Sequence, residues 1–174
     1  MGFLQRLFGD TRQRAALAPL YRAAVAVGRD PAWYREGRVP DTLDGRFDMI
    51  AAIVALILIR IEAEGDDGRA PALLLTETFI DDMDGTLRQI GIGDHVVGKH
   101  VGKMMGALGG RLAAFRSGRD AGAGFRAAVT RNIFHEAPPS PEAAAFVAGR
   151  LESFDRSLGA LSLEALLAGD IAQP

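Results

Sequence analysis

The sequence predicts an all-α fold, an irregular bundle of about six to eight helices around one long apolar central helix. Strand signals are nearly absent, because the β-branched residues lie inside runs with helical period. Glycine, proline and aspartate divide the chain into segments with apolar residues every three or four positions. The run Met49–Ile59 is apolar on every face, but its eleven residues are too few to span a bilayer, which needs roughly 20. We therefore expect this run to be the centre of a soluble bundle.

Local signals place the ends of these helices. A side-chain oxygen at a helix start accepts a hydrogen bond from a free backbone N–H, and proline is favoured at the next position. Such starts occur at Asp30-Pro31, Pro40-Asp41-Thr42 and Ser140-Pro141, and Asp94 caps the helix after the Gly91-Ile92-Gly93 break. With turns at 65–68 and 117–124 and an end at Pro138-Pro139, the predicted helices cover 11–27 (bent or restarted at Pro19), 32–36, 42–64, 71–90, 94–116, 125–134, 140–158 and 162–167.

Two of the predicted helices carry an apolar stripe that should face the core. In helix 71–90 the stripe is Phe79, Ile80, Met83, Leu87 and Ile90. In the helix after Asp94 it is Val97, Val101, Met104, Met105, Leu108, Leu112 and Phe115.

Composition limits the classes of function. The chain has 174 residues, which fits a single helical domain over 11–174 preceded by an N-terminal segment, 1–10. It has no cysteine, which excludes disulfides, thiolate catalysis and iron–sulfur clusters. The net charge of −2 argues against a nucleic-acid partner. Without a secretory leader, the protein is expected in the cytoplasm.

The N-terminal segment permits two interpretations. Phe3, Leu4, Leu7 and Phe8 recur at helical spacing with arginines nearby, as in a short interfacial anchor. The same residues fit a terminal turn that packs on the core.

The motif Asp82-Met83-Asp84-Gly85-Thr86 looks like the nucleophile motif of haloacid-dehalogenase-type phosphatases. That chemistry needs the motif at the end of a buried parallel strand, whereas the apolar residues here keep a helical period on both sides. Glu77, Asp81, Asp84 and Arg88 instead fall on one polar helix face, where Asp84 and Arg88 can pair at i, i+4. This face is either solvated or binds a partner.

The sequence contains no pattern that predicts a metal or cofactor site. His95 and His100 diverge by about 140° on a helix and cannot chelate one ion from one face, and His135 lies elsewhere. We expect no metal, no cofactor and no catalytic residues.

Glycines form an i+4 row in the helix after Asp94. They are Gly98, Gly102, Gly106 and Gly110, and each costs roughly 1 kcal/mol relative to alanine inside a helix. Such a row leaves a groove into which another helix can approach closely. The groove is filled either by a helix of the same domain or by a helix of a partner.

The stretch Phe79–Leu112 resembles the ubiquinol–cytochrome c chaperone family. The resemblance rests on a carboxylate-rich helix, a Leu-Arg pair, a Gly-Ile-Gly-Asp turn, a Val-Gly-Lys step and a later Gly-Arg pair. Flanking pieces agree, among them Arg46-Phe47-Asp48 and Arg131-Asn132. The pattern departs from the family at Gly102, where a basic residue is expected, and at Leu108-Gly109, where an aromatic residue is usual.

The resemblance implies an all-α, non-enzymatic assembly chaperone for the respiratory cytochrome bc complex that shields newly made cytochrome b. A second assembly factor and the cytoplasmic face of the inner membrane are further expected partners, and a stable scaffold protein is the alternative function. The candidate partner-binding residues are Asp81, Asp84, Arg88, Asp94, Gly98, Lys99, Gly102, Lys103, Gly106 and Arg111.

Overall fold

Eight helices make up the described part of the chain. The computed structural model describes residues 3–89, 94–120, 124–135 and 140–174, and within these ranges it describes no side chain of residues 3–14, 94–97 or 120. The helices are α1 (Phe3–Gly28), α2 (Pro31–Arg35), α3 (Leu43–Glu62), α4 (Asp66–Gln89), α5 (Asp94–Asp120), α6 (Gly124–Phe134), α7 (Pro141–Gly159) and α8 (Leu163–Ala168). These ranges contain no strand, which confirms the predicted all-α fold.

Helix α3 lies among the others and contacts α1, α4, α5, α6 and α7. Every residue from Met49 to Ile59 is at most 8% exposed. The helix is not apolar along its length, however, because Asp44, Arg46 and Asp48 occupy its first turns and Glu62 its end. The expectation of one long apolar central helix is therefore not supported. In the described ranges, no helix combines the length and the apolar character needed to cross a membrane.

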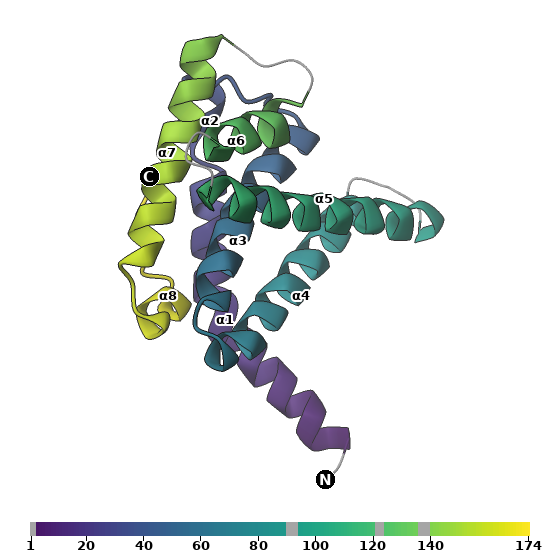
Figure 1. Cartoon of the computed structure of the whole chain (residues 1–174). Helices are drawn as coiled ribbons and strands as arrows, with labels where there is room; N and C mark the ends of the chain where they lie inside the picture. Colours follow the sequence, from purple (N-terminus) through teal and green to yellow (C-terminus); the bar gives the residue numbers. More distant parts are fainter. Residues whose placement is uncertain (1–2, 90–93, 121–123, 136–139) are drawn as a thin grey trace.

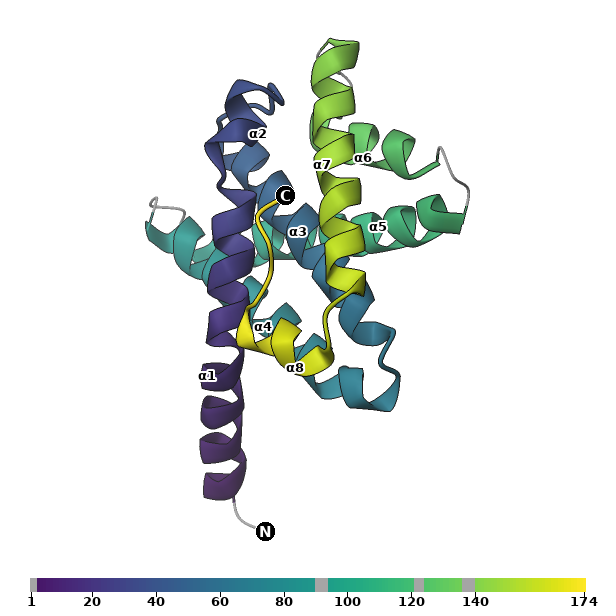
Figure 2. The ribbon, with the colours of Figure 1, turned by 90° about the vertical axis from the view of Figure 1, so that its left-hand side faces the viewer.

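The helices around α3 leave two ends projecting from the bundle. The first turns of α1 extend beyond the other helices in both views (Figures 1 and 2). Helix α5 crosses the bundle beside α6, and its N-terminal end projects from the bundle near the C-terminal end of α4 (Figure 1). Helix α8 packs on α1, and the chain then runs back along α1 to its end (Figure 2).

Side-chain caps begin several helices where the sequence predicted them. Oδ1 of Asp30 accepts a hydrogen bond from the backbone N–H of Ala32 at 2.9 Å, and Oγ1 of Thr42 accepts one from Gly45 at 3.1 Å. Oγ of Ser140 accepts one from a backbone N–H of α7 at 3.4 Å. Each cap satisfies a donor that the first turn of a helix leaves without an intrahelical partner.

Other helix ends differ from the prediction. Helix α1 begins earlier and continues through Pro19, α4 begins before Pro71, and α5 continues into the predicted loop. Two glycines explain the last two differences, because they lie where helices approach closely. A Cβ atom on Gly68 would lie 2.0 Å from a carbonyl oxygen of α3, and one on Gly118 would lie 2.8 Å from the Cα atom of Phe125. The predicted breaks at 91–93 and 138–139 lie outside the described residues.

Candidate partner-binding face

The glycine row of α5 lies on the exposed side of the helix. Gly98, Gly102, Gly106, Gly109 and Gly110 are all exposed, and a Cβ atom built on any of them would meet nothing within 4 Å. We call these five residues the glycine face. No described residue fills it, so the alternative that a helix of the same domain occupies the groove is wrong for this part of the chain. The backbone of α5 is instead open to an approaching partner.

The opposite side of α5 holds the helix on the bundle. Leu108 is 1% exposed and Phe115 is fully buried. The ring of Phe115 lies 5.3 Å from the ring of Phe125 on α6, measured between centroids. Since apolar contacts on this side anchor the helix, the glycine face adds nothing to the packing of the fold.

Arg111 joins α5 to α3 and α6 from inside the protein. It is 2% exposed, and its Nη2 donates to Oδ1 of Asp48 and, at 2.9 Å, to the carbonyl oxygen of Asn132. Its guanidinium lies 5.6 Å from the ring centre of Phe47. Burial lowers the pKa of Arg111, and the carboxylate of Asp48 opposes that shift. The prediction that Arg111 binds a partner is corrected here, because its buried side chain holds three helices together.

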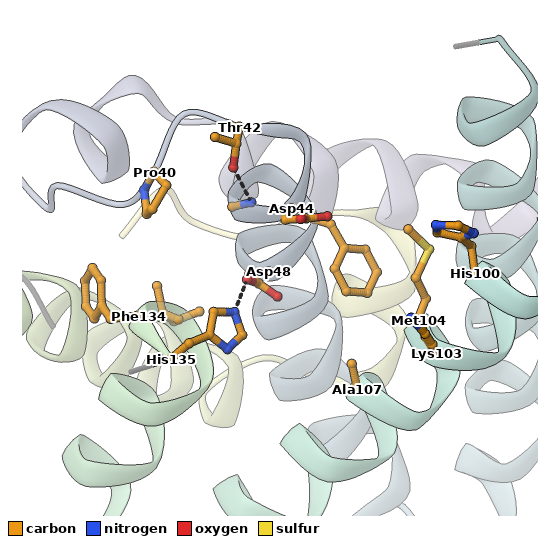
Figure 3. Close-up of a pocket in the computed structure, with 13 residues that line it drawn as sticks. Pro40, Thr42, Asp44, Asp48, His100, Lys103, Met104, Ala107, Phe134 and His135 are labelled. Atoms are coloured by element: carbon orange, nitrogen blue, oxygen red, sulfur yellow. Dashed lines mark hydrogen bonds and ion pairs between the residues drawn. The ribbon is translucent and has the colours of Figure 1, made fainter. Parts of the chain in front are cut away.

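A pocket of about 520 Å³ opens between α3, α5 and the end of α6. His100, Lys103, Met104 and Ala107 of α5 line one side, and His135 lies on the opposite side with Asp48 between them (Figure 3). Nε2 of His135 lies 2.8 Å from Oδ2 of Asp48. The remaining lining residues include the apolar side chains of Pro40, Phe47, Ile133 and Phe134. The pocket therefore offers apolar walls with charged side chains at its edge.

The comparisons with known proteins agree on one family. A family model described as Ubiquinol-cytochrome C chaperone matches residues 35–173. The chain belongs to this family of chaperones. It is also similar to a solved structure titled as the crystal structure of the Cbp3 homolog from Brucella abortus, with 32% sequence identity. That match covers 98% of this chain and 96% of the other, with a TM-score of 0.78. No curated protein matches the chaperone.

Three separate pieces of the family resemblance meet at the Arg111 junction. The Gly-Arg pair supplies Arg111, the Arg46-Phe47-Asp48 piece supplies its carboxylate and its ring contact, and the Arg131-Asn132 piece supplies its carbonyl acceptor. The sequence indicates these pieces only as separate parts of the family resemblance, and no local pattern shows that they contact one another. The available signal was a charged residue, Asp48, directly before an apolar run.

Helix α4 of the chaperone carries the predicted carboxylates. Nε of Arg88 lies 2.6 Å from Oδ2 of Asp84, which confirms the i, i+4 pair, and Asp81 is exposed on the same helix. Asp82 accepts a hydrogen bond from the hydroxyl of Tyr21 at 2.7 Å and so ties α4 to α1. Burial and this bond raise the pKa of Tyr21. The phosphatase interpretation is wrong, because the motif lies within a helix of a non-enzymatic chaperone.

The predicted α5 residues divide between the surface and the interior. Lys99 and Lys103 are exposed beside the glycine face, and Lys103 also lines the pocket. The side chain of Asp94 lies outside the described residues. Helices α4 and α5 contact each other, so the predicted carboxylates and the glycine face belong to neighbouring elements.

Proposed function

We propose that the chain is an assembly chaperone of the respiratory cytochrome bc complex that binds newly made cytochrome b along the glycine face. Membership of the ubiquinol–cytochrome C chaperone family supports the general role. The observation that carries the binding site is that five exposed glycines in one helix have open space where a side chain would stand. Each costs roughly 1 kcal/mol of helix stability, and the fold draws no packing from any of them.

A row of small residues suits the binding of a membrane helix. Helices that present such rows approach closely, so that backbone atoms make dispersion contacts along the interface. Newly made membrane helices expose apolar surface and aggregate if they are left uncovered. A client helix lying on the glycine face would be covered until its partner subunits arrive, with Lys99 and Lys103 beside it to contact polar ends of the client.

The N-terminal end of the chain bears on where the chaperone acts. Residues 3–10 of the N-terminal segment form the projecting first turns of α1, and we propose that segment 1–10 contacts the cytoplasmic face of the inner membrane, where a client emerges. Residues 11–174 form the single domain that binds the client, and a second assembly factor is a further candidate partner.

Co-purification tests the proposal. The tagged protein is recovered from its own host after gentle solubilisation, and the proteins that accompany it are identified by mass spectrometry. We expect cytochrome b without the full subunit set of the mature complex. Recovery of that full set would favour a stable scaffold protein, and recovery of no respiratory subunit would contradict both functions.

Variants then locate the binding site. Gly102→Leu/Gly106→Leu places two bulky side chains on the glycine face and should lower cytochrome b recovery at least tenfold. The matched control is Gly149→Leu on α7, where a Cβ atom also meets nothing within 4 Å. Circular dichroism establishes that each variant is folded. Unchanged recovery with a folded double variant would exclude the glycine face as the binding site.

A further inference from the structure

Arginines gather where α1, α2 and α3 meet. A pocket of about 520 Å³ is lined by Arg29, Arg35 and Arg46, together with Tyr34, Asp41 and Pro31. Asp41 pairs with Arg46 at 2.6 Å, and the contact of Arg35 with Glu36 is a long one at 4.0 Å. No described residue forms a hydrogen bond or ion pair with the guanidinium of Arg29. The pocket therefore keeps an excess of positive charge that the fold does not use.

The same arginines border an apolar trough. Arg29 and Arg46 also line a second, smaller depression of about 160 Å³, whose other residues are mainly apolar: Leu43, Phe47, Ile50, Met83, Leu87 and Met104. Leu43, at the edge of this trough, is 43% exposed. Cationic groups directly beside an apolar trough match a molecule that has an anionic head and an apolar chain.

Positive charge is also concentrated in the N-terminal part of the chain. The first 38 residues contain seven arginines against three carboxylates, although the whole protein has a net charge of −2. Arg22 is exposed on α1, and Arg29 directly follows the last residue of that helix, seven positions after Arg22. Cations spread over neighbouring elements fit an extended anionic surface better than they fit a single small anion.

We propose that the Arg29–Arg35–Arg46 pocket binds the phosphate group of an anionic phospholipid at a membrane surface, with Leu43 and the trough turned toward the acyl chains. This inference rests on the proposed function, in which the chaperone works at the membrane, and adds a lipid contact at the end of α1 opposite the N-terminal segment. Arginine recognises phosphate through two parallel N–H donors, and a negatively charged leaflet draws such clusters to its surface. The hydroxyl of Tyr34 donates to the carbonyl oxygen of Gly28 at 2.9 Å, which fixes one wall of the pocket.

Vesicle co-sedimentation of the full chain tests the inference. We expect binding to vesicles of phosphatidylcholine with phosphatidylglycerol and much weaker binding to phosphatidylcholine alone. Arg29→Gln/Arg35→Gln should weaken binding to the anionic vesicles about 30-fold, because each arginine near such a surface contributes about a factor of five. The charge-matched control is Arg69→Gln/Arg156→Gln, two exposed arginines on α4 and α7, and it should change binding less than twofold.

The outcomes separate this inference from the proposed function. Absence of any binding by the wild-type chain would overturn both the membrane contact and the pocket, whereas binding that is equal for the two double variants would overturn the pocket alone. Leu43→Ser should weaken vesicle binding several-fold, and no change would overturn the role of the trough. A roughly 10-fold molar excess of inorganic phosphate over accessible lipid should not displace the protein. Displacement would instead identify a site for free phosphate and overturn the lipid assignment.

Discussion

Replacing Arg111 by methionine should destabilise the protein strongly, although the residue belongs to a motif of a partner-binding family. The substitution keeps a long side chain over Phe47 but removes the donor to Asp48 and to the carbonyl oxygen of Asn132. Asp48 is 5% exposed and would be left with His135 as its remaining side-chain partner. Removing one partner of a buried ion pair costs about 3–5 kcal/mol, because the other charge is left in a medium that solvates it poorly.

The expected change is large enough to measure directly. A domain of this length loses about 2–4 °C of melting temperature per kcal/mol, so Arg111→Met should lower Tm by about 6–20 °C. Asp48→Leu/Arg111→Met should recover part of that loss, since no charge stays buried. Recovery should be incomplete, because the carbonyl of Asn132 still lacks its donor at a cost of about 1–3 kcal/mol.

Thermal and urea unfolding followed by circular dichroism check these values. The control is Arg116→Met on the same helix, whose ion pair with Glu62 is about half exposed and should contribute no more than about 1 kcal/mol. If Arg111→Met were no more harmful than Arg116→Met, or if the double variant were less stable than Arg111→Met alone, the argument from the buried charge would be refuted.

Three further predictions follow from glycines and from one cap. Gly102→Ala/Gly106→Ala should raise the free energy of unfolding by about 1 kcal/mol per site, because both positions are exposed and have open space, and denaturant melts would show it. The same change at Gly68 should have the opposite sign, lowering that free energy by about 1–3 kcal/mol, since the new Cβ atom would collide with a carbonyl oxygen of α3; a gain at Gly68 would contradict this contact. The hydrogen bond from a backbone N–H of α2 and the nearby Arg150 lower the pKa of Asp30. Its carboxylate therefore stabilises the fold above the unfolded-state pKa of about 3.9, and this stabilisation is lost as pH falls through the lower folded-state pKa. Asp30→Asn keeps the capping oxygen but removes the charge, so it should lower the free energy of unfolding by roughly 1 kcal/mol at pH 7. The difference from wild type should shrink below about pH 4, and a difference that does not change with pH would contradict this reasoning.

The parts of the fold that depend on neighbouring residues in the chain could be predicted from the sequence. The starts of α2, α3 and α7 follow from Asp30, Thr42 and Ser140, because a cap joins a side chain to a backbone N–H two or three residues away. Local sequence alone predicts turns at Gly68 and Gly118. Their contacts are with another helix, and that information depends on how the helices pack.

In the candidate site, too, features that depend on chain neighbours could be predicted, whereas features that depend on helix packing could not. The glycine row was visible as a spacing, but whether it is filled depends on where α5 lies on the bundle, and its openness follows only from the structure. Arg111 carries a charge that sequence reasoning assigned to the surface. Its carboxylate partner is 63 residues away, so no local pattern could have placed it inside.

The position of α3 in the chain has a consequence for the synthesis of the protein itself. Arg60 at the end of α3 donates to the carbonyl oxygen of Leu158 on α7, 98 residues later. At roughly 5–20 residues per second, the ribosome needs about 5–20 s between making one residue and the other. During that interval the apolar run Met49–Ile59 has been made, but the last helix that covers it has not. This protein, whose family assists the assembly of other proteins, therefore passes on the ribosome through a state in which its own most apolar helix, α3, is not yet covered by α7.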